Sequence, residues 1–339
     1  MHEFDHAALE RCLQQHVAGF GRLDTITKFP DGQSNPTYQI RSGDDAYVLR
    51  ARPPGKLLKS AHAVDREYRV MKALAETGVP VPEVFYLSGD DTPLGTQFMV
   101  MDLVEGRIFW DPALPDQERT ARGRIYDAMN ATLARLHRVR PERVGLDDYG
   151  KPGNYFERQV ARWSRQYLET ATDPLPDADW LMAWLSDHMV ADDGESCIVH
   201  GDYRIDNIIF HPDREEIAAV LDWELSTLGH PLADLAYQCM HWRLPYEGHF
   251  RGLGGVNRHA EGLPDEADYV ERYCDRRGID PPGNWDFYVV FSYFRLLAIL
   301  QGVLRRGLDG NASNPRDMHR WRDIIARMAR DARALAEHG

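Results

Sequence analysis

The alternation of apolar and polar positions over the first hundred residues predicts a small β-rich region with one helix. Four short runs of β-forming residues predict strands, at 38–40, 47–50, 84–87 and 97–101. The first two runs flank a Ser-Gly-Asp-Asp turn, so we expect them to form a hairpin. Apolar residues recur with helical spacing between residues 61 and 77, which predicts a helix that ends at Gly78.

Beyond Gly106 the pattern changes to mostly helix. Apolar faces with helical spacing predict helices at 125–137, 155–168, 180–189, 232–237 and 316–335. A β interlude divides these helices, with one strand at 197–199 and a hairpin formed by 207–210 and 217–221. The pattern therefore predicts an α+β protein in which strands dominate the first part and helices the second.

The run 287–304 is the most apolar part of the chain and is about as long as a membrane-spanning helix. Arg295 and Gln301 interrupt it, which favours a helix buried in the protein. Taken together, the elements predict a small β-rich lobe at 1–105 and a larger helical lobe at 106–339.

Composition narrows the class of protein. The chain has 339 residues, with 53 Asp and Glu against 40 Lys and Arg, and a formal net charge of −13. Its length favours two lobes over a single core, and its acidic balance argues against a nucleic-acid partner. The four cysteines form no C-x-x-C pair, and the N-terminus lacks a basic and apolar signal sequence. We therefore expect a cytoplasmic protein that acts on a small molecule, with no membrane and no obligate protein partner.

The stretch with the clearest chemistry is H-G-D-Y-R-I-D-N at 200–207, followed by L-D-W-E at 221–224. It places three oxygen-bearing side chains, those of Asp202, Asn207 and Asp222, at the ends of short β segments. Carboxylate and amide oxygens are the ligands that Mg²⁺ selects. A carboxylate near a bound metal and a phosphate can also accept the proton of an attacking hydroxyl, as phosphoryl transfer requires.

These motifs resemble those of the aminoglycoside phosphotransferase family, a small-molecule branch of the protein-kinase-like fold. Gly201 stands where protein kinases have Arg in H-R-D, and Asp-Trp-Glu replaces Asp-Phe-Gly. Together with L-R-x-R-P-P-G at 49–55, the motifs resemble the subgroup related to kinase domains fused to acyl-CoA dehydrogenases. The resemblance covers roughly residues 25 to 300. It implies a bilobal fold with a nucleotide-binding N-terminal lobe, a hinge at about 102–106 and a helical lobe that carries the substrate pocket.

The resemblance also implies a role for each residue of the motif. Asp202 would orient or deprotonate the acceptor hydroxyl, and Asn207 and Asp222 would bind Mg²⁺ between the phosphates of ATP. Arg204 lies where a cation would face the γ-phosphate. The alternative is that Arg204 only forms a salt bridge on the surface. His200 would brace the loop by hydrogen bonding. Asp234, in the downstream G-H-P-L-A-D motif, would accept hydrogen bonds from the same loop.

A kinase-like site also needs a cation for the α- and β-phosphates, held by an acid from the following helix. Arg50 ends a predicted strand at this place, although most of the wider family has Lys. Glu67 would be its partner, because it lies on an apolar helix stripe where an unpaired acid is costly. The alternative for Glu67 is a carboxylate at the edge of the stripe that reaches water.

Two loops complete the predicted nucleotide site. Ser34 and Asn35 follow a single glycine and could reach phosphate oxygens, although an ordinary polar turn explains this loop nearly as well. The connector from Asp102 to Val104 would offer backbone groups to adenine, as the resemblance implies.

We therefore predict an enzyme, a small-molecule kinase that uses ATP and Mg²⁺ to phosphorylate a hydroxyl. The acceptor is left open between a hydroxy acid or acyl thioester and an aminoglycoside-like sugar. One alternative is a nucleotide-binding regulator without turnover. A metal-dependent phosphohydrolase is the other, supported only by the set of oxygen ligands.

Overall fold

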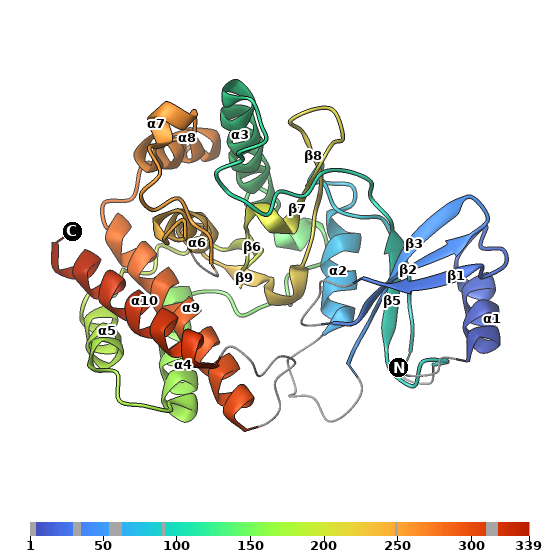
Figure 1. Cartoon of the computed structure of the whole chain (residues 1–339), viewed down its shortest axis with the longest axis horizontal. Coiled ribbons are helices and arrows are strands. Elements are labelled where there is room, and N and C mark those ends of the chain that lie inside the picture. Colours follow the sequence, from blue (N-terminus) through green and yellow to red (C-terminus); the bar gives the residue numbers. More distant parts are fainter. Residues whose placement is uncertain are drawn as a thin grey trace. The chain divides into compact units, whose positions relative to one another are not determined.

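The computed structural model describes residues 5–29, 35–53, 63–89, 92–247, 250–309 and 318–338 (Figure 1). Contacts within the chain divide it into two compact units. The first, called the sheet unit here, comprises Met1–Trp110, Glu142–Leu146 and Ile205–Ser226. The second, the helical unit, comprises Asp111–Pro141, Asp147–Arg204 and Thr227–Gly339. This division differs from a single boundary after residue 105, because the segment 205–226 contacts the N-terminal strands and their connector.

The sheet unit contains a five-stranded antiparallel sheet in the order β1-β2-β3-β5-β4 (Figure 1). Its strands are β1 (Thr25–Lys28), β2 (Thr37–Ser42), β3 (Asp45–Ala51), β4 (Val84–Leu87) and β5 (Phe98–Asp102). The predicted hairpin is present as β2 and β3, with Ser42 paired to Asp45. The strand β1 was not predicted from the sequence, since its four residues include only one large apolar side chain, Ile26.

Two helices cover opposite faces of this sheet. Leu9 and Leu13 of α1 (His6–His16) pack in one apolar cluster with Leu49 of β3. Successive strand residues point to opposite faces, so Arg50 faces the other side, where α2 (Val64–Leu74) lies. The prediction of a single helix in this region is therefore wrong, because α1 is a second one.

The predicted helix at 61–77 corresponds to α2, but α2 ends at Leu74. Gly78 has a left-handed backbone, with φ of 77°, and lies four residues beyond this end. It therefore belongs to the turn that follows α2 and does not cap the helix directly.

The predicted second hairpin is also present, formed by β7 (Ile208–Phe210) and β8 (Ile217–Val220). Arg107 and Phe210 exchange two backbone hydrogen bonds of 2.8 and 2.9 Å, and Val220 N–H donates to Pro80 O at 2.9 Å. A side chain at Gly106 would overlap the carbonyl oxygen of Phe210. The hairpin is therefore held closely to the connector that follows the sheet. Among the described residues, 3₁₀ turns occur at η1 (Pro141–Arg143), η2 (Ile205–Asn207) and η3 (Trp223–Leu225).

The helical unit contains the remaining elements (Figure 1). Its helices are α3 (Arg119–Leu136), α4 (Tyr155–Thr170), α5 (Pro176–Asp187), α6 (Leu232–Arg243), α7 (Arg258–Glu261), α8 (Glu266–Arg277), α9 (Trp285–Leu308) and α10 (Met318–His338). A two-stranded sheet pairs β6 (Cys197–Val199) with β9 (Thr227–Gly229). The predicted helices are all present, whereas β9 and its pairing with β6 were not foreseen.

The apolar run at 287–304 forms most of α9, which packs against α4, α5, α6 and α10. Within the part of the chain that the structure describes, α9 alone is long and apolar enough to cross a membrane. However, 83% of its most apolar stretch is buried inside the protein. This burial confirms the prediction of a core helix.

Replacing Gly106 with alanine tests the close approach of the connector to the β7–β8 hairpin. We expect Gly106→Ala to lower the free energy of unfolding by about 1–3 kcal/mol, because the added methyl group forces the backbone of Phe210 away. Urea unfolding followed by tryptophan fluorescence measures the change. Gly89→Ala is the matched control, since its methyl group would meet no atom within 4 Å. Equal unfolding midpoints for the two variants would contradict the packing described.

Candidate active site

The predicted site residues fall into two sets, one in each unit. Asp202 and Arg204 belong to the helical unit, and the others that the structure describes belong to the sheet unit. Ser34 lies outside the described residues. The two sets are described in turn below.

Arg50 is the centre of the set in the sheet unit. Its Nε lies 3.0 Å from Glu67 Oε2, which is the ion pair that the sequence predicts. Its Nη2 lies 2.7 Å from Asp222 Oδ1 and 3.9 Å from Glu224 Oε2. One guanidinium therefore faces three carboxylates, and this part of the site has an excess of negative charge that suits a cation.

Glu67 is deeply buried, with 2% of its surface exposed. Burial raises the pKa of its carboxyl group to about 8, although the neighbouring Arg50 acts in the opposite direction. Asn35 Nδ2 donates a 2.9 Å hydrogen bond to Glu67 Oε1. The side chain of Asn35 therefore fixes the acid that holds Arg50, which is a different contact from the phosphate contact expected of this loop.

Asn207 and Asp222 lie at the same end of the β7–β8 hairpin. Ile208 pairs with Val220, and the N–H of Leu221 donates to the carbonyl oxygen of Asn207 at 2.8 Å. Asp222 follows directly, in a left-handed conformation with φ of 64°. The buried Trp223, whose Nε1 donates to Val220 O at 2.9 Å, anchors the backbone beside it.

This arrangement fits a magnesium ion. The donors are an amide oxygen and a carboxylate oxygen, and Mg²⁺ is commonly held by one or two such groups together with waters and substrate phosphates. Among the described residues, no group of three or more His, Cys, Asp or Glu side chains forms a metal cage. The residues therefore favour a metal that binds together with a phosphorylated ligand.

The connector offers one open stretch of backbone. Asp102 is the last residue of β5, and its N–H already donates to Glu83 O at 2.8 Å. The backbone N–H and C=O of Val104 make no hydrogen bond to another described residue. Val104 is thus the better placed of the two to meet the edge of a base.

In the helical unit, the loop after β6 carries Asp202. Gly201 has φ of 85°, a conformation that side-chain-bearing residues rarely adopt, which explains glycine in the centre of His-Gly-Asp. Asp234 Oδ2 accepts from His200 N–H at 2.6 Å, and its Oδ1 accepts from Gly201 N–H at 2.8 Å. His200 Nδ1 accepts from the N–H of Asp202 at 3.1 Å. The predicted bracing roles of His200 and Asp234 are confirmed by these contacts.

Positively charged side chains surround Asp202. Arg204 Nε lies 3.4 Å from Asp202 Oδ1, and Tyr237 shares a hydrogen bond with the same carboxylate. Burial opposes ionisation of Asp202, but the positive charges of Arg204 and Arg295 contribute to holding its pKa below the usual value. Asp202 is therefore ionised near neutral pH, as a proton acceptor must be.

Arg295 supports the loop that carries Asp202, a role that the sequence alone did not assign. Its Nη2 donates a 2.6 Å hydrogen bond to the carbonyl oxygen of Gly201, so α9 supports the loop directly. The sequence did carry a signal, because the single arginine of the apolar run 287–304 must have a polar partner in the fold.

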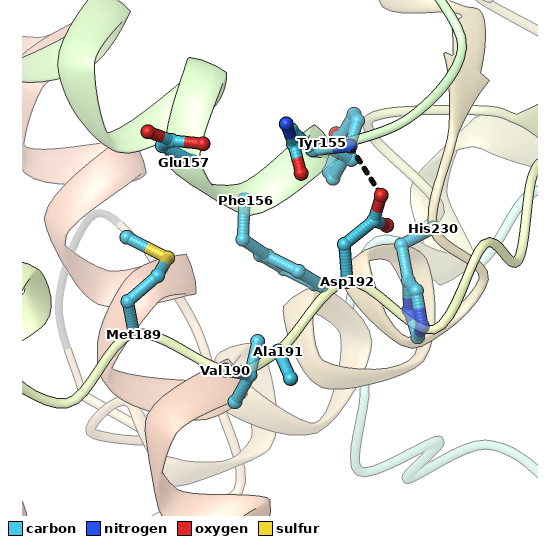
Figure 2. A pocket seen from close by; sticks show the side chains of 9 residues that line it. Tyr155, Phe156, Glu157, Met189, Val190, Ala191, Asp192 and His230 are labelled. Carbon is cyan, nitrogen blue, oxygen red and sulfur yellow. Dashed lines mark hydrogen bonds between the residues drawn. The ribbon is translucent and has the colours of Figure 1, made fainter.

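A separate small pocket lies elsewhere in the helical unit (Figure 2). It is lined by Asn154, Tyr155, Phe156, Glu157, Met189, Val190, Ala191, Asp192 and His230. Figure 2 shows Asp192 accepting the hydrogen bond from the N–H of Asn154, at 2.9 Å. None of the predicted site residues lines this pocket, so we do not assign it to the reaction.

A strand cation paired with a helix glutamate, a loop that carries an aspartate after β6 and an Asn–Asp hairpin end are together typical of kinase-like phosphotransferases. Comparison with known proteins agrees. A model described as "Phosphotransferase enzyme family" matches residues 25–269. The chain is 47% identical over 290 residues to acyl-CoA dehydrogenase family member 10 of Mus musculus, a match that covers 85% of this chain and 27% of that protein.

Solved structures give the same result. A crystal structure from Ralstonia eutropha, provisionally described as an aminoglycoside phosphotransferase, is 44% identical with a TM-score of 0.89, and the match covers 98% of both chains. The aminoglycoside phosphotransferase APH(4)-Ia, in complex with AMP-PNP and hygromycin B, is 15% identical with a TM-score of 0.64. That match covers 98% of this chain and 99% of the other, and it shows a common fold.

The chain therefore belongs to the phosphotransferase enzyme family. Both the predicted family and the predicted α+β kinase-like fold are confirmed. The chain spans about a quarter of the length of the mouse relative.

Asp234→Asn tests the support of the catalytic loop. We expect a loss of about 3 kcal/mol in the free energy of unfolding at pH 7, because an amide –NH₂ then faces backbone donors. Burial opposes ionisation of Asp234, but its hydrogen bond with His137 contributes to holding its pKa below the usual value. The stabilisation is therefore present above the unfolded pKa of about 4 and is lost as the pH falls through the folded pKa.

Urea unfolding at pH 7 and below pH 4 measures this effect, and the difference between variant and wild type should shrink at the lower pH. Asp213→Asn, in the exposed turn of the β7–β8 hairpin, is the control. A difference that stays constant over this range would show that the charge of Asp234 is not what stabilises the loop.

Proposed function

We propose that the protein transfers the γ-phosphoryl group of ATP, with Mg²⁺, to a hydroxyl of a small molecule. The observation that carries the proposal is the network in which Arg50 joins Glu67 of α2 to Asp222 at the hairpin end. In one unit it joins a guanidinium, which suits phosphate oxygens, to a carboxylate, which suits a metal ion. Membership of the phosphotransferase family supports the same reaction.

In the proposed reaction, Asp202 accepts the proton of the acceptor hydroxyl as its oxygen bonds to the γ-phosphorus. The bond from the γ-phosphorus to the bridging oxygen breaks, and ADP leaves. Arg204 stabilises the charge on the transferred group, and Arg50 holds the α- and β-phosphates. Asn207 and Asp222 would hold Mg²⁺, which neutralises phosphate charge when bound. Val104, with Asp102 in the same connector, would offer backbone groups to adenine, and the Ser34–Asn35 loop would cover the phosphates.

Two classes of acceptor are compatible with the comparisons. Similarity to a part of an acyl-CoA dehydrogenase family member supports a hydroxy acid or an acyl thioester. The fold shared with a hygromycin-bound phosphotransferase supports an amino sugar less strongly, since that likeness is one of fold. A screen of ADP release with hydroxy acids, acyl thioesters, amino sugars and choline-like alcohols would identify the acceptor.

Asp202→Asn tests the proton acceptor. We expect kcat for ADP release with the acceptor found in the screen to fall at least about 100-fold, because the amide cannot take the proton. The affinity for ADP should change less than about twofold, since Asp202 acts on the acceptor. Asp213→Asn should behave like wild type. A kcat within tenfold of wild type for Asp202→Asn would refute the assigned role.

Asp222→Asn tests the metal ligand without changing the backbone, because Asn also tolerates the left-handed conformation. In wild type we expect Mg²⁺ to strengthen ADP binding about tenfold or more, and in the variant this enhancement should disappear. Calorimetric titration of ADP with and without Mg²⁺ measures it, with Asp213→Asn again as the control. The same dependence on Mg²⁺ in both proteins would overturn the assignment.

A further inference from the structure

The helical unit contains a buried arginine with no acidic partner. Arg295 of α9 has 5% of its surface exposed, and its guanidinium lies between the rings of Trp163 and Tyr237, at 5.7 and 4.9 Å from their centres. Its recorded hydrogen bond goes to the carbonyl oxygen of Gly201. Among the described residues, no carboxylate lies within 4 Å of its nitrogens. Buried arginines are normally paired, so this one is poised for an anion.

A second guanidinium lies on the same indole ring. Arg162 of α4 is 4.8 Å from the centre of the Trp163 ring, and in the described chain it too has no carboxylate within salt-bridge distance. Burial lowers the pKa of Arg162, and the positive charge of Arg295 contributes to the decrease. Solvent partly screens the exposed Arg162, but its charge and that of Arg295 lie near the same ring, and an anion beside that ring would attract both.

The acids of this region do not supply that anion. Asp202 is engaged with Arg204 and Tyr237. Both oxygens of Asp234 accept hydrogen bonds from the loop backbone. Neither acid forms an ion pair with Arg162 or Arg295, although the charge of Arg295 helps to lower the pKa of Asp202. The guanidinium of Arg295 therefore lies near the proposed proton acceptor without a direct ion-pair partner.

The indole N–H of Trp163 points to the same conclusion. Trp163 Nε1 and His241 Nε2 are both buried and, in the part of the chain that the structure describes, have no hydrogen-bond partner. Burial, with the charge of Arg204, lowers the pKa of His241 to about 3, so its ring is neutral. The indole N–H and the guanidinium can only donate, so the group that satisfies them must be an acceptor.

We infer that Arg295, Arg162 and Trp163 bind an anionic group, a carboxylate or a phosphate, on the acceptor molecule. This inference rests on the proposed function, because it assumes that the acceptor hydroxyl meets Asp202. It selects hydroxy acids and related anionic alcohols over amino sugars. Arg295 and Trp163 are then specificity-determining residues, and they leave nucleotide binding unaffected.

The test is calorimetric binding of three matched alcohols to the protein loaded with ADP and Mg²⁺. The compounds 3-hydroxybutyrate, butane-1,3-diol and 4-aminobutan-2-ol share a skeleton and differ in charge. We expect the acid to bind at least tenfold more tightly than the diol, and the amine to bind more weakly than both. Glycerol 3-phosphate in place of the acid shows whether a phosphate or a carboxylate is preferred. Equal affinity for the acid and the diol would overturn the inference.

Two variants locate the anion. Trp163→Phe keeps the ring and removes the N–H, and it should weaken binding of the acid about fivefold while leaving the diol unchanged. Arg295→Met should abolish the preference for the acid. The control on the same helix is Arg305→Met, whose guanidinium pairs with Asp309 on the surface, and it should leave the preference intact. If both single variants, Trp163→Phe and Arg295→Met, keep the preference for the acid, the inference is wrong. If Arg295→Met folds too poorly to be measured, Trp163→Phe decides alone, and unweakened binding of the acid contradicts the inference.

ADP affinity, measured in each protein, separates this inference from the proposed function. Unchanged ADP binding with no preference for the acid refutes the anion site alone. Failure of the wild-type protein to bind ADP, or to release it from ATP with any acceptor, refutes the proposed function. A selective loss of ADP affinity in Arg295→Met would show that the arginine contacts the nucleotide, which also overturns the inference.

Discussion

The geometry of the catalytic loop depends on a single buried carboxylate. Asp234 accepts hydrogen bonds from two successive backbone N–H groups, those of His200 and Gly201, and so stabilises a left-handed turn that exists only because residue 201 is glycine. The position of Asp202 follows from that turn. Arg295 supports the same turn from the carbonyl side. An acid, a glycine and an arginine from three separate parts of the chain thus define where the carboxylate proposed as proton acceptor lies.

In the sheet unit, a single strand serves two purposes. The alternation of side chains along β3 sends Leu49 toward α1 and Arg50 toward α2, so one strand contributes both to the apolar core and to the charged site. Glu67 is tolerated at 2% exposure because Arg50 and Asn35 both contact it. An arginine can join Glu67 and Asp222 at once because its nitrogens diverge, which a single ammonium group does less readily.

Much of this could be predicted from the sequence, and the failures have physical reasons. Both hairpins, the core helix α9 and the Arg50–Glu67 pair depend on local periodicity or on a buried charge that needs a partner. In contrast, α1, β1 and β9 are short or polar segments whose structure is decided by what they pack against. The grouping of segment 205–226 with the N-terminal strands depends on contacts far apart in the sequence, such as Val220 to Pro80. Likewise, no spacing rule connects Arg295 to Gly201, which lie 94 residues apart.

The apolarity of α9 has a consequence for any topology assigned to this chain from hydropathy. A hydropathy scan of this chain would count the helix as a membrane crossing and assign its two flanks to opposite sides of a bilayer. Here the same residues are enclosed by four neighbouring helices. A topology assigned from hydropathy alone would therefore place a bilayer across the core of the helical unit.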